Sequence, residues 1–257
     1  MVPLRISVVD FLNARPLTWG LLHEPPPGVH VSRDAPSACA AKLASGEADV
    51  GLIPSIECQR IPGLSVVSGL GIAASSEVRS VLLVSDVSRD RIRSVELDPA
   101  SRTSAALTRI LLKRVYGLEP QYRERTPGAA ADARLIIGDP ALKTRLNGHV
   151  VLDLAAEWRA FSGRSFVFAV WAVRDGADAE LAGRAVRASR ARAVSEFPRL
   201  VGEGSAGTGL SEAVVEDYLR HSLHFELTHG DVEGMRLFYR LAAEDGLIEG
   251  VRELPLV

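Results

Sequence analysis

Short strand-like and helix-like segments alternate along roughly the first 170 residues of the chain. Runs of β-branched and aliphatic residues, most of them ended by a turn signal, predict strands at 5–11, 29–33, 49–53, 64–67, 81–85, 94–97, 135–137, 150–154 and 166–173. Between several of these runs, helical spacing of apolar residues predicts helices at 16–22, 37–45 and 102–116. Such alternation is typical of an α/β fold with a parallel or mixed sheet covered by helices.

The pattern changes after residue 178, because the rest of the chain has mostly helical periodicity. We expect helices at 179–203, 211–224 and 231–244, the last two starting at Ser211 and Asp231. Two arrangements fit this order of segments. One is a single doubly wound sheet. The other has two lobes, residues 1–85 plus 174–257 and residues 86–173, with mixed sheets flanked by helices and a ligand cleft between the lobes.

Positive and negative charges nearly balance, with 30 Lys and Arg against 32 Asp and Glu and a net charge of −2. A nucleic-acid-binding protein usually has a basic excess, so we expect no nucleic-acid partner. No segment has the apolar length of a membrane span, and charged residues interrupt the N-terminal apolar stretch too early for a secretory signal. The two cysteines, Cys39 and Cys58, form no CxxC motif. These features predict a cytoplasmic protein without a membrane partner.

Three motifs resemble ligand sites but lack what those sites need. The GxGxxA at 69–74 is followed by another strand instead of a helix, so we expect a loop there. The glycine-rich stretch at 202–209 lacks the Lys-Ser/Thr ending of a phosphate loop, and we expect a flexible connection between helices. His221, His224, Glu226 and His229 cluster near a helix end without an HExxH motif, and we expect no metal site.

The turn before the predicted helix at 102–116 is dense in hydroxyl groups and carries one arginine. It contains Ser101, Arg102, Thr103 and Ser104. Free N–H groups and the positive end of the helix dipole make such a start a site for a carboxylate or phosphate. The alternative is simple capping of the helix by Ser101 or Thr103.

Other strand-end turns are expected at the same edge of the sheets. Their residues that can face a ligand are Asn13, Arg15, Pro54, Ser55, Arg79 and Ser80. The turn at 138–140 adds Gly138 and Asp139, the one acid in these turns, which we interpret as a structural helix N-cap before Pro140.

Seven segments, in order, resemble the chorismate dehydratase family of the futalosine route to menaquinone. They are FLNARPL (11–17), ADVGLIPSIE (48–57), EVRSVLLVS (77–85), ELDPASRTSAALTRILL (96–112), LIIGDPAL (135–142), DLAAEWRAFSG (153–163) and FVFAVW (166–171). The resemblance implies a cytoplasmic carbon–oxygen lyase with a two-lobe, type II periplasmic-binding-protein-like fold. Its reaction would eliminate water from chorismate to give 3-[(1-carboxyvinyl)oxy]benzoate.

The resemblance also places Asn13 and Ser80 at the departing hydroxyl and a carboxylate, as the expected catalytic residues. Chorismate has two carboxylates, so we expect an arginine (Arg15, Arg79 or Arg102) and the 101–104 turn to receive them. The predicted substrate-binding residues are Arg15, Pro54, Ser55, Arg79, Ser101, Arg102, Thr103, Ser104, Gly138, Asp139, and the aromatic walls Trp158, Phe166 and Phe168.

Elimination that makes a ring aromatic needs positioning and modest acid–base help, so we expect no metal and no redox cofactor. The cleft turns contain no His or Cys, which favours a route in which the substrate's own enolpyruvyl carboxylate takes the proton. Two alternatives remain. One is a non-catalytic cytosolic protein that binds small carboxylates. The other is the related 1,4-dihydroxy-6-naphthoate synthase, whose usual SPCPND-type N-terminal segment is replaced here by DFLNARP.

Overall fold

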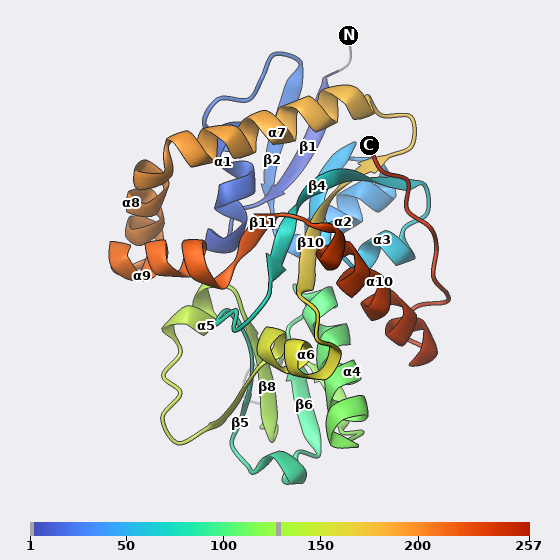
Figure 1. Cartoon of the computed structure of the whole chain (residues 1–257), viewed down its shortest axis with the longest axis vertical. Coiled ribbons are helices and arrows are strands. Elements are labelled where there is room, and N and C mark those ends of the chain that lie inside the picture. The colour runs from blue at the N-terminus through green and yellow to red at the C-terminus, as the bar shows by residue number, and fades with distance from the viewer. Residues whose placement is uncertain (1–2, 127–129) are drawn as a thin grey trace.

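The computed structural model describes residues 3–126 and 130–257 and contains two mixed β-sheets covered by helices. Figure 1 shows the six-stranded sheet in the upper half of the molecule and the five-stranded sheet in the lower half. The alternation of strands and helices thus confirms the predicted α/β class with two mixed sheets.

The six-stranded sheet has the order β11-β4-β10-β3-β1-β2. Its strands are β1 (Leu4–Val9), β2 (Val29–Asp34), β3 (Val50–Pro54), β4 (Leu64–Ala74), β10 (Phe166–Arg174) and β11 (His224–Glu226). β1 pairs in parallel with β2 and β3, whereas β10 is antiparallel to both β3 and β4. The carboxyl ends of β1 and β3 therefore lie at one edge of the sheet.

The five-stranded sheet has the order β7-β6-β8-β5-β9. Its strands are β5 (Val81–Ser85), β6 (Ser94–Leu97), β7 (Gln121–Glu124), β8 (Ala133–Ile137) and β9 (Val150–Asp153). β6 is parallel to β7 and β8, and β5 runs antiparallel to β8 and β9. The start of β5 and the end of β8 consequently lie side by side, at the end of this sheet that faces the other one.

Sheet membership differs from the predicted lobe boundaries at two strands. β5, expected in the first lobe, belongs to the five-stranded sheet, and β10, expected in the second lobe, lies inside the six-stranded sheet. The chain therefore crosses between the sheets at 75–80 and returns at 163–165. Both strands are apolar and almost wholly buried. Such runs indicate a central strand but carry no information about which sheet the strand joins.

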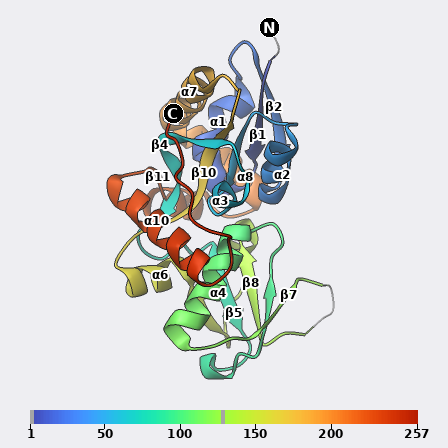
Figure 2. The same ribbon diagram turned by 90° about the vertical axis from the view of Figure 1, so that its right-hand side faces the viewer.

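Helices cover both sheets (Figures 1 and 2). They are α1 (Arg15–His23), α2 (Pro36–Ser45), α3 (Glu57–Arg60), α4 (Arg102–Tyr116), α5 (Asp139–Lys143), α6 (Leu154–Ser162), α7 (Ala179–Ser195), α8 (Phe197–Thr208), α9 (Glu212–Asp217) and α10 (His229–Glu244), with 3-10 turns at Leu12–Ala14 and Arg89–Arg91 and a π-helical turn at Tyr218–Ser222. α1 packs closely on α7 at Gly20, which has no Cβ. A Cβ there would lie only 2.6 Å from Ser189 Cα. α10 packs against β10 and α4 and so contacts elements of both sheets.

The two glycine-rich motifs are not loops, so both predictions are wrong. Residues 69–74 form the second half of β4, and all but the last residue of 202–209 lie in α8. A Cβ on Gly71 would lie 2.7 Å from the Ala169 carbonyl oxygen, and one on Gly204 would lie 2.8 Å from Leu12 Cδ1. These two glycines allow close packing of neighbouring elements instead of loop flexibility.

The predicted helical tail is also divided differently. The segment 179–203 is two helices that meet at Glu196, with Pro198 in the first turn of α8. The segment 211–224 contains α9, the π-helical turn and the start of β11. Ser211 caps α9 as expected, but the helix predicted from Asp231 begins at His229, and Thr228 is its N-cap. Asp231 instead completes a capping box with Thr228.

Two features of the described residues bear on membranes and metal ions. No helix in 3–126 or 130–257 is long and apolar enough to span a membrane. The same residues contain no cluster of three or more His, Cys, Asp or Glu side chains arranged to hold a metal ion. His224 pairs with Asp231 at 2.9 Å.

Candidate active site

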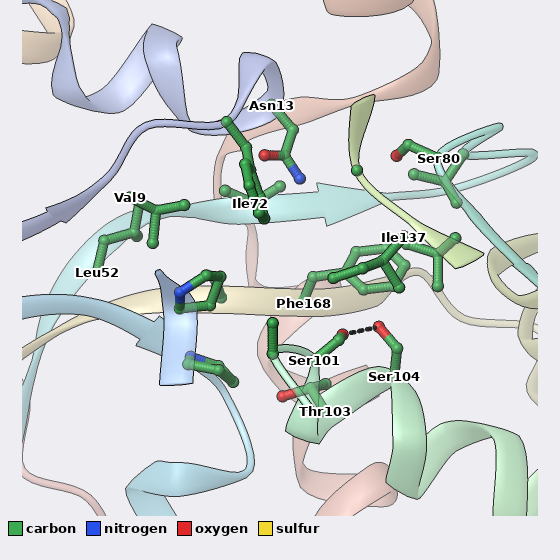
Figure 3. Close-up of a pocket in the computed structure, with 18 of the residues that line it drawn as sticks. Val9, Asn13, Leu52, Ile72, Ser80, Ser101, Thr103, Ser104, Ile137 and Phe168 are labelled. Carbon is green, nitrogen blue, oxygen red and sulfur yellow. Dashed lines mark hydrogen bonds between the residues drawn. The ribbon is translucent and has the colours of Figure 1, made fainter. Parts of the chain in front are cut away.

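A cavity of about 60 Å³, which we call the central cavity, lies between the two sheets. Its lining consists of Val9, Phe11, Asn13, Pro36, Leu52, Ile53, Pro54, Ile72, Val78, Ser80, Val81, Ala100, Ser101, Thr103, Ser104, Ile137, Gly138, Phe168, Ala169 and Leu223. Figure 3 shows Asn13 and Ser80 on one side of this space and the start of α4 on the other. A mostly apolar lining with a few polar groups among it is typical of a small-molecule site.

Asn13 lies in the 3-10 turn that follows β1, where the chain bends before Arg15 begins α1. The carboxylate of Asp139, in the other half of the molecule, accepts a hydrogen bond from Leu12 N–H at 3.2 Å. This contact fixes the turn. The Asn13 Oδ1 atom is buried and has no hydrogen-bond partner within the described residues. An unpaired buried acceptor is costly, so this amide is available for a ligand.

Ser80 directly precedes β5 and is completely buried. Its carbonyl oxygen accepts the Gly138 N–H at 2.7 Å, and its Oγ accepts the Tyr218 hydroxyl at 2.6 Å. Gly138 has a φ of +65°, a conformation that favours glycine. These two bonds hold Ser80 in place at the cavity wall.

Arg79 has a φ of +60°, which is strained for a residue with a side chain. Its backbone N–H donates to Asp153 Oδ2 at 2.6 Å. Its guanidinium donates to Ser222 Oγ at 2.9 Å and forms a 2.8 Å ion pair with Asp217. The contact from His221, together with the hydrogen bond and ion pair from Arg79, lowers the pKa of Asp217 below its usual range. The Arg79 side chain does not line the central cavity.

The start of α4 faces the cavity through Ser101, Thr103 and Ser104. The Ser101 side chain makes no capping hydrogen bond to the helix and instead donates to Ser104 Oγ at 2.7 Å. Thr103 Oγ1 accepts the Ile56 N–H at 3.2 Å, across the two halves of the molecule. Simple capping by either residue is therefore not what the structure shows. The positive end of this 15-residue helix is directed at the cavity.

The predicted arginines lie outside the central cavity. Arg102 forms a 2.6 Å ion pair with Glu57, whose other carboxylate oxygen is 2.8 Å from Arg60. Arg15 lies 3.8 Å from Asp10. Among the described residues, the cavity lining contains no charged side chain. The helix start, hydroxyls and Asn13 are thus the polar groups that a ligand meets there.

The predicted aromatic walls divide between cavity and core. Phe168 lines the cavity, whereas Phe166 and Trp158 are buried behind it. Phe166 packs edge-on against both Trp158 and Phe168, and the Trp158 indole donates to the Ser165 carbonyl at 3.1 Å. Phe166 and Trp158 therefore support the wall without forming it.

Two other predicted residues also lie behind the lining. Ser55 follows Pro54, which does line the cavity, and donates its hydroxyl to the Val167 carbonyl at 2.8 Å. Asp139 is the first residue of α5, and Gly138 is the N-cap, so the predicted capping role of Asp139 is wrong. Burial raises the pKa of the Asp139 carboxyl, and the Leu12 N–H acts in the opposite direction.

Eight of the residues predicted from the sequence line the central cavity, but most of its apolar lining residues were not predicted. The missed residues are Val9, Phe11, Pro36, Leu52, Ile53, Ile72, Val78, Val81, Ala100, Ile137, Ala169 and Leu223. Several of them are next to the predicted site turns in the sequence, and this proximity could have indicated that they line the same cavity. Tyr218 was also missed, because it lies far along the chain in a segment predicted as plain helix.

Curated relatives include two chorismate dehydratases. The one from Thermus thermophilus is 26% identical over 93% of this chain and 94% of its own length. The one from Campylobacter jejuni is 30% identical over 63% of each chain. Among solved structures, the periplasmic aliphatic sulphonate binding protein SsuA from Escherichia coli superposes with a TM-score of 0.65 at 18% identity, covering 100% of this chain and 94% of that one.

The last similarity shows the fold, which is that of periplasmic binding proteins, with two sheets and a cavity between them. The family model described as menaquinone biosynthesis matches residues 4–244, nearly the whole chain. The chain therefore belongs to this menaquinone biosynthesis family.

Proposed function

We propose that this protein is a chorismate dehydratase, a hydro-lyase that removes water from chorismate to give 3-[(1-carboxyvinyl)oxy]benzoate. The family and the two relatives named chorismate dehydratase support this function. The central cavity supplies the structural argument, because its chemistry suits a small apolar ring that carries carboxylates.

The observation that carries the proposal is the start of α4 opposite Asn13 and Ser80 in an uncharged cavity (Figure 3). Helix N-termini bind carboxylates through unpaired N–H groups and the helix dipole, without a cationic side chain. Ser101, Thr103 and Ser104 add hydroxyl groups at this point. In the proposed complex, one substrate carboxylate occupies the helix start, and the ring lies against Phe168 and the aliphatic walls.

The reaction breaks one C–H bond and one C–O bond of the ring. The electron pair of the C–H bond enters the ring and completes its aromatic system, and the pair of the C–O bond leaves with the hydroxyl oxygen. That oxygen takes up a proton and departs as water. The change is redox-neutral and driven by aromaticity, so positioning and hydrogen bonding supply most of what the site must provide.

The substrate's enolpyruvyl carboxylate serves as the base in this proposal. Among the described residues, the lining contains no His, Asp, Glu, Lys, Cys or Tyr that can accept the ring proton. Ser80 donates a hydrogen bond to the departing hydroxyl, and the Asn13 Nδ2 group donates to the carboxylate that receives the proton. Asn13 and Ser80 lie on the same side of the cavity, and the buried, unpaired Asn13 Oδ1 can accept the proton of a substrate hydroxyl.

Incubation of the purified protein with chorismate tests this function. We expect the absorbance of a new aromatic ring, and mass spectrometry should identify a product that has lost one water. Binding of chorismate without conversion would indicate a carboxylate-binding protein and contradict the proposal. Conversion of a later intermediate to a dihydroxynaphthoate, with chorismate untouched, would identify the related synthase instead.

A further inference from the structure

We infer that Tyr218 is a positioning residue that holds Ser80 with its hydroxyl proton free for the substrate. The inference rests on the proposed function, in which Ser80 donates to the departing hydroxyl. Tyr218 does not line the central cavity, and it acts through its 2.6 Å hydrogen bond to Ser80 Oγ. Both side chains are buried, with relative exposures of 1% and 0%.

The direction of this hydrogen bond follows from counting donors. A tyrosine hydroxyl and a serine hydroxyl each carry one proton. Ser80 Oγ is the partner that the described residues provide for the Tyr218 hydroxyl. If Ser80 donated instead, the buried Tyr218 proton would have no acceptor, which is costly. Tyr218 therefore donates, and the Ser80 proton remains available at the cavity wall.

The surroundings of Tyr218 keep it a neutral donor. Burial raises the pKa of Tyr218 well above its ordinary value, and the hydrogen bond with Ser80 acts in the opposite direction. The Arg79 guanidinium carbon lies 5.9 Å from the centre of the Tyr218 ring. Hydrogen bonds in series strengthen one another, so donation from Tyr218 also makes the Ser80 hydroxyl a better donor.

The π-helical turn Tyr218–Ser222 explains how one segment reaches both Ser80 and its neighbour. Ser222, at the end of this turn, accepts from the Arg79 guanidinium, and Asp217, just before it, forms the ion pair with Arg79. Tyr218 contacts Ser80 from the same turn. π-helical turns are rare and frequent at functional sites. Here the turn holds the side chains of Arg79 and Ser80. Asp153 holds the strained Arg79 backbone by accepting its N–H.

A double-mutant cycle tests the inference. Tyr218→Phe removes only the hydroxyl, and we expect kcat for chorismate to fall about tenfold, the loss of one hydrogen bond in the transition state, with KM changed less than about twofold. In the Ser80→Ala background the same substitution should leave kcat unchanged, because the group through which Tyr218 acts is absent. Equal losses in both backgrounds, or no loss in the first, would overturn the inference.

Two controls separate positioning from folding. Tyr116→Phe removes a hydroxyl that bonds Glu157 at the far end of α4 and should leave kcat unchanged. If Tyr218→Phe does not fold, 3-fluorotyrosine placed at 218 keeps the ring and hydroxyl and makes the hydroxyl a stronger donor. We then expect kcat to rise in the Ser80 protein and to stay constant in the Ser80→Ala protein. A kcat unchanged in both would overturn the inference.

Failure of the proposed function gives a different result. If the protein binds chorismate without converting it, the proposed function is wrong, and the cycle is measured on dissociation constants instead. Tyr218→Phe should then lower the affinity for chorismate, because chorismate bears the ring hydroxyl. The affinity for 3-[(1-carboxyvinyl)oxy]benzoate, which lacks this hydroxyl, should stay unchanged. Equal effects on the two ligands would overturn the positioning of Ser80.

Discussion

At the scale of single residues, Asn13 and Ser80 are polar groups at the wall of a largely apolar cavity. Asn13 Oδ1 has no partner among the described residues, and Ser80 Oγ accepts from Tyr218 and keeps its own proton free. Hydrogen bonds in an apolar, water-poor site are stronger than in water, so in the proposed mechanism the Ser80 donor acts strongly on the departing hydroxyl.

Ser80→Ala should lower kcat for chorismate by about a hundredfold or more, because removing one preorganised donor has effects of this order. Steady-state kinetics measures the loss, and thermal unfolding shows that the variant folds. The matched control is Ser85→Ala, since Ser85 is similarly buried at the other end of β5 but donates to the Val87 and Asp132 carbonyls. Full activity in Ser80→Ala would remove Ser80 from the reaction.

Asn13→Ala should likewise lower kcat for chorismate by about a hundredfold, while the protein remains folded. Its buried oxygen has no structural partner among the described residues, so the substitution removes no internal hydrogen bond from it. Unfolding and chorismate turnover are measured on the same preparation. Asn147→Ala, in an exposed turn, is the control. A variant with wild-type kcat would show that the amide has no part in catalysis.

At the scale of elements, helix starts perform two different tasks in this fold. α9 and α10 are capped by the side chains of Ser211 and Thr228, whereas α4 has no side-chain cap and faces the central cavity. The first two starts stabilise the protein. α4 shares the lack of a side-chain cap with α1, α2, α5 and α8, but its start lines the cavity, and in the proposed complex it receives a substrate carboxylate.

Ser101→Asp should separate these tasks, because a carboxylate at this N-cap occupies the place of the substrate's own. We expect the helix to be stabilised by about 0.5–1 kcal/mol, and KM for chorismate to rise about tenfold or more. Thermal unfolding and steady-state kinetics give the two values. Ser211→Asp, at the start of α9, should change KM little. An unchanged KM in Ser101→Asp would contradict carboxylate binding at α4.

The start of α10 gives a pH prediction. Burial raises the pKa of Asp231, but hydrogen bonds from Ser165, Thr228 and His224 outweigh it and leave the pKa below the ordinary value. A carboxyl with a lowered folded-state pKa stabilises the protein above its unfolded pKa of about 3.9, and the contribution is lost as pH falls through the folded value.

Asp231→Asn should therefore lower the free energy of unfolding by about 1–3 kcal/mol at pH 7, with the difference from the wild type shrinking below about pH 4. Urea unfolding across this pH range measures it. Asp175→Asn, in an exposed turn after β10, is the control and should change the free energy of unfolding little. A difference that stayed constant or grew on acidification would contradict the assignment.

At the scale of the whole molecule, side-chain contacts bridge the two halves around the cavity. They join Arg102 to Glu57, Thr103 to the Ile56 N–H, and Asp139 to the Leu12 N–H. A substrate that enters a cavity closed in this way must pass through a more open arrangement, and bound ligand should favour the closed one.

Small-angle scattering should show a smaller radius of gyration when an aromatic dicarboxylate analogue is bound. Arg102→Ala should enlarge the radius of the ligand-free protein, because it removes an ion pair between the halves. Arg60→Ala removes the other ion pair of Glu57, which lies within one half, and should leave the radius unchanged. Identical radii for all four samples would contradict closure.

The sequence predicted the α/β class and the turns that supply Asn13, Ser80 and the α4 start, because turn chemistry and hydrophobic periodicity are local signals. Placing β10 needed long-range pairing, since its apolar run suits either sheet. The three arginines were expected in the cavity, yet each has a carboxylate partner elsewhere in the fold. Tyr218 reaches Ser80 only through tertiary structure, from 138 residues away in the sequence.

The most direct test of the account is a crystal structure of the Ser80→Ala protein with chorismate bound. We predict chorismate in the central cavity, with one carboxylate at the start of α4, the ring against Phe168, and the ring hydroxyl directed at residue 80. The enolpyruvyl carboxylate should lie within reach of the ring C–H that is lost. Chorismate bound elsewhere, or both of its carboxylates held by Arg102 and other surface arginines, would contradict the account.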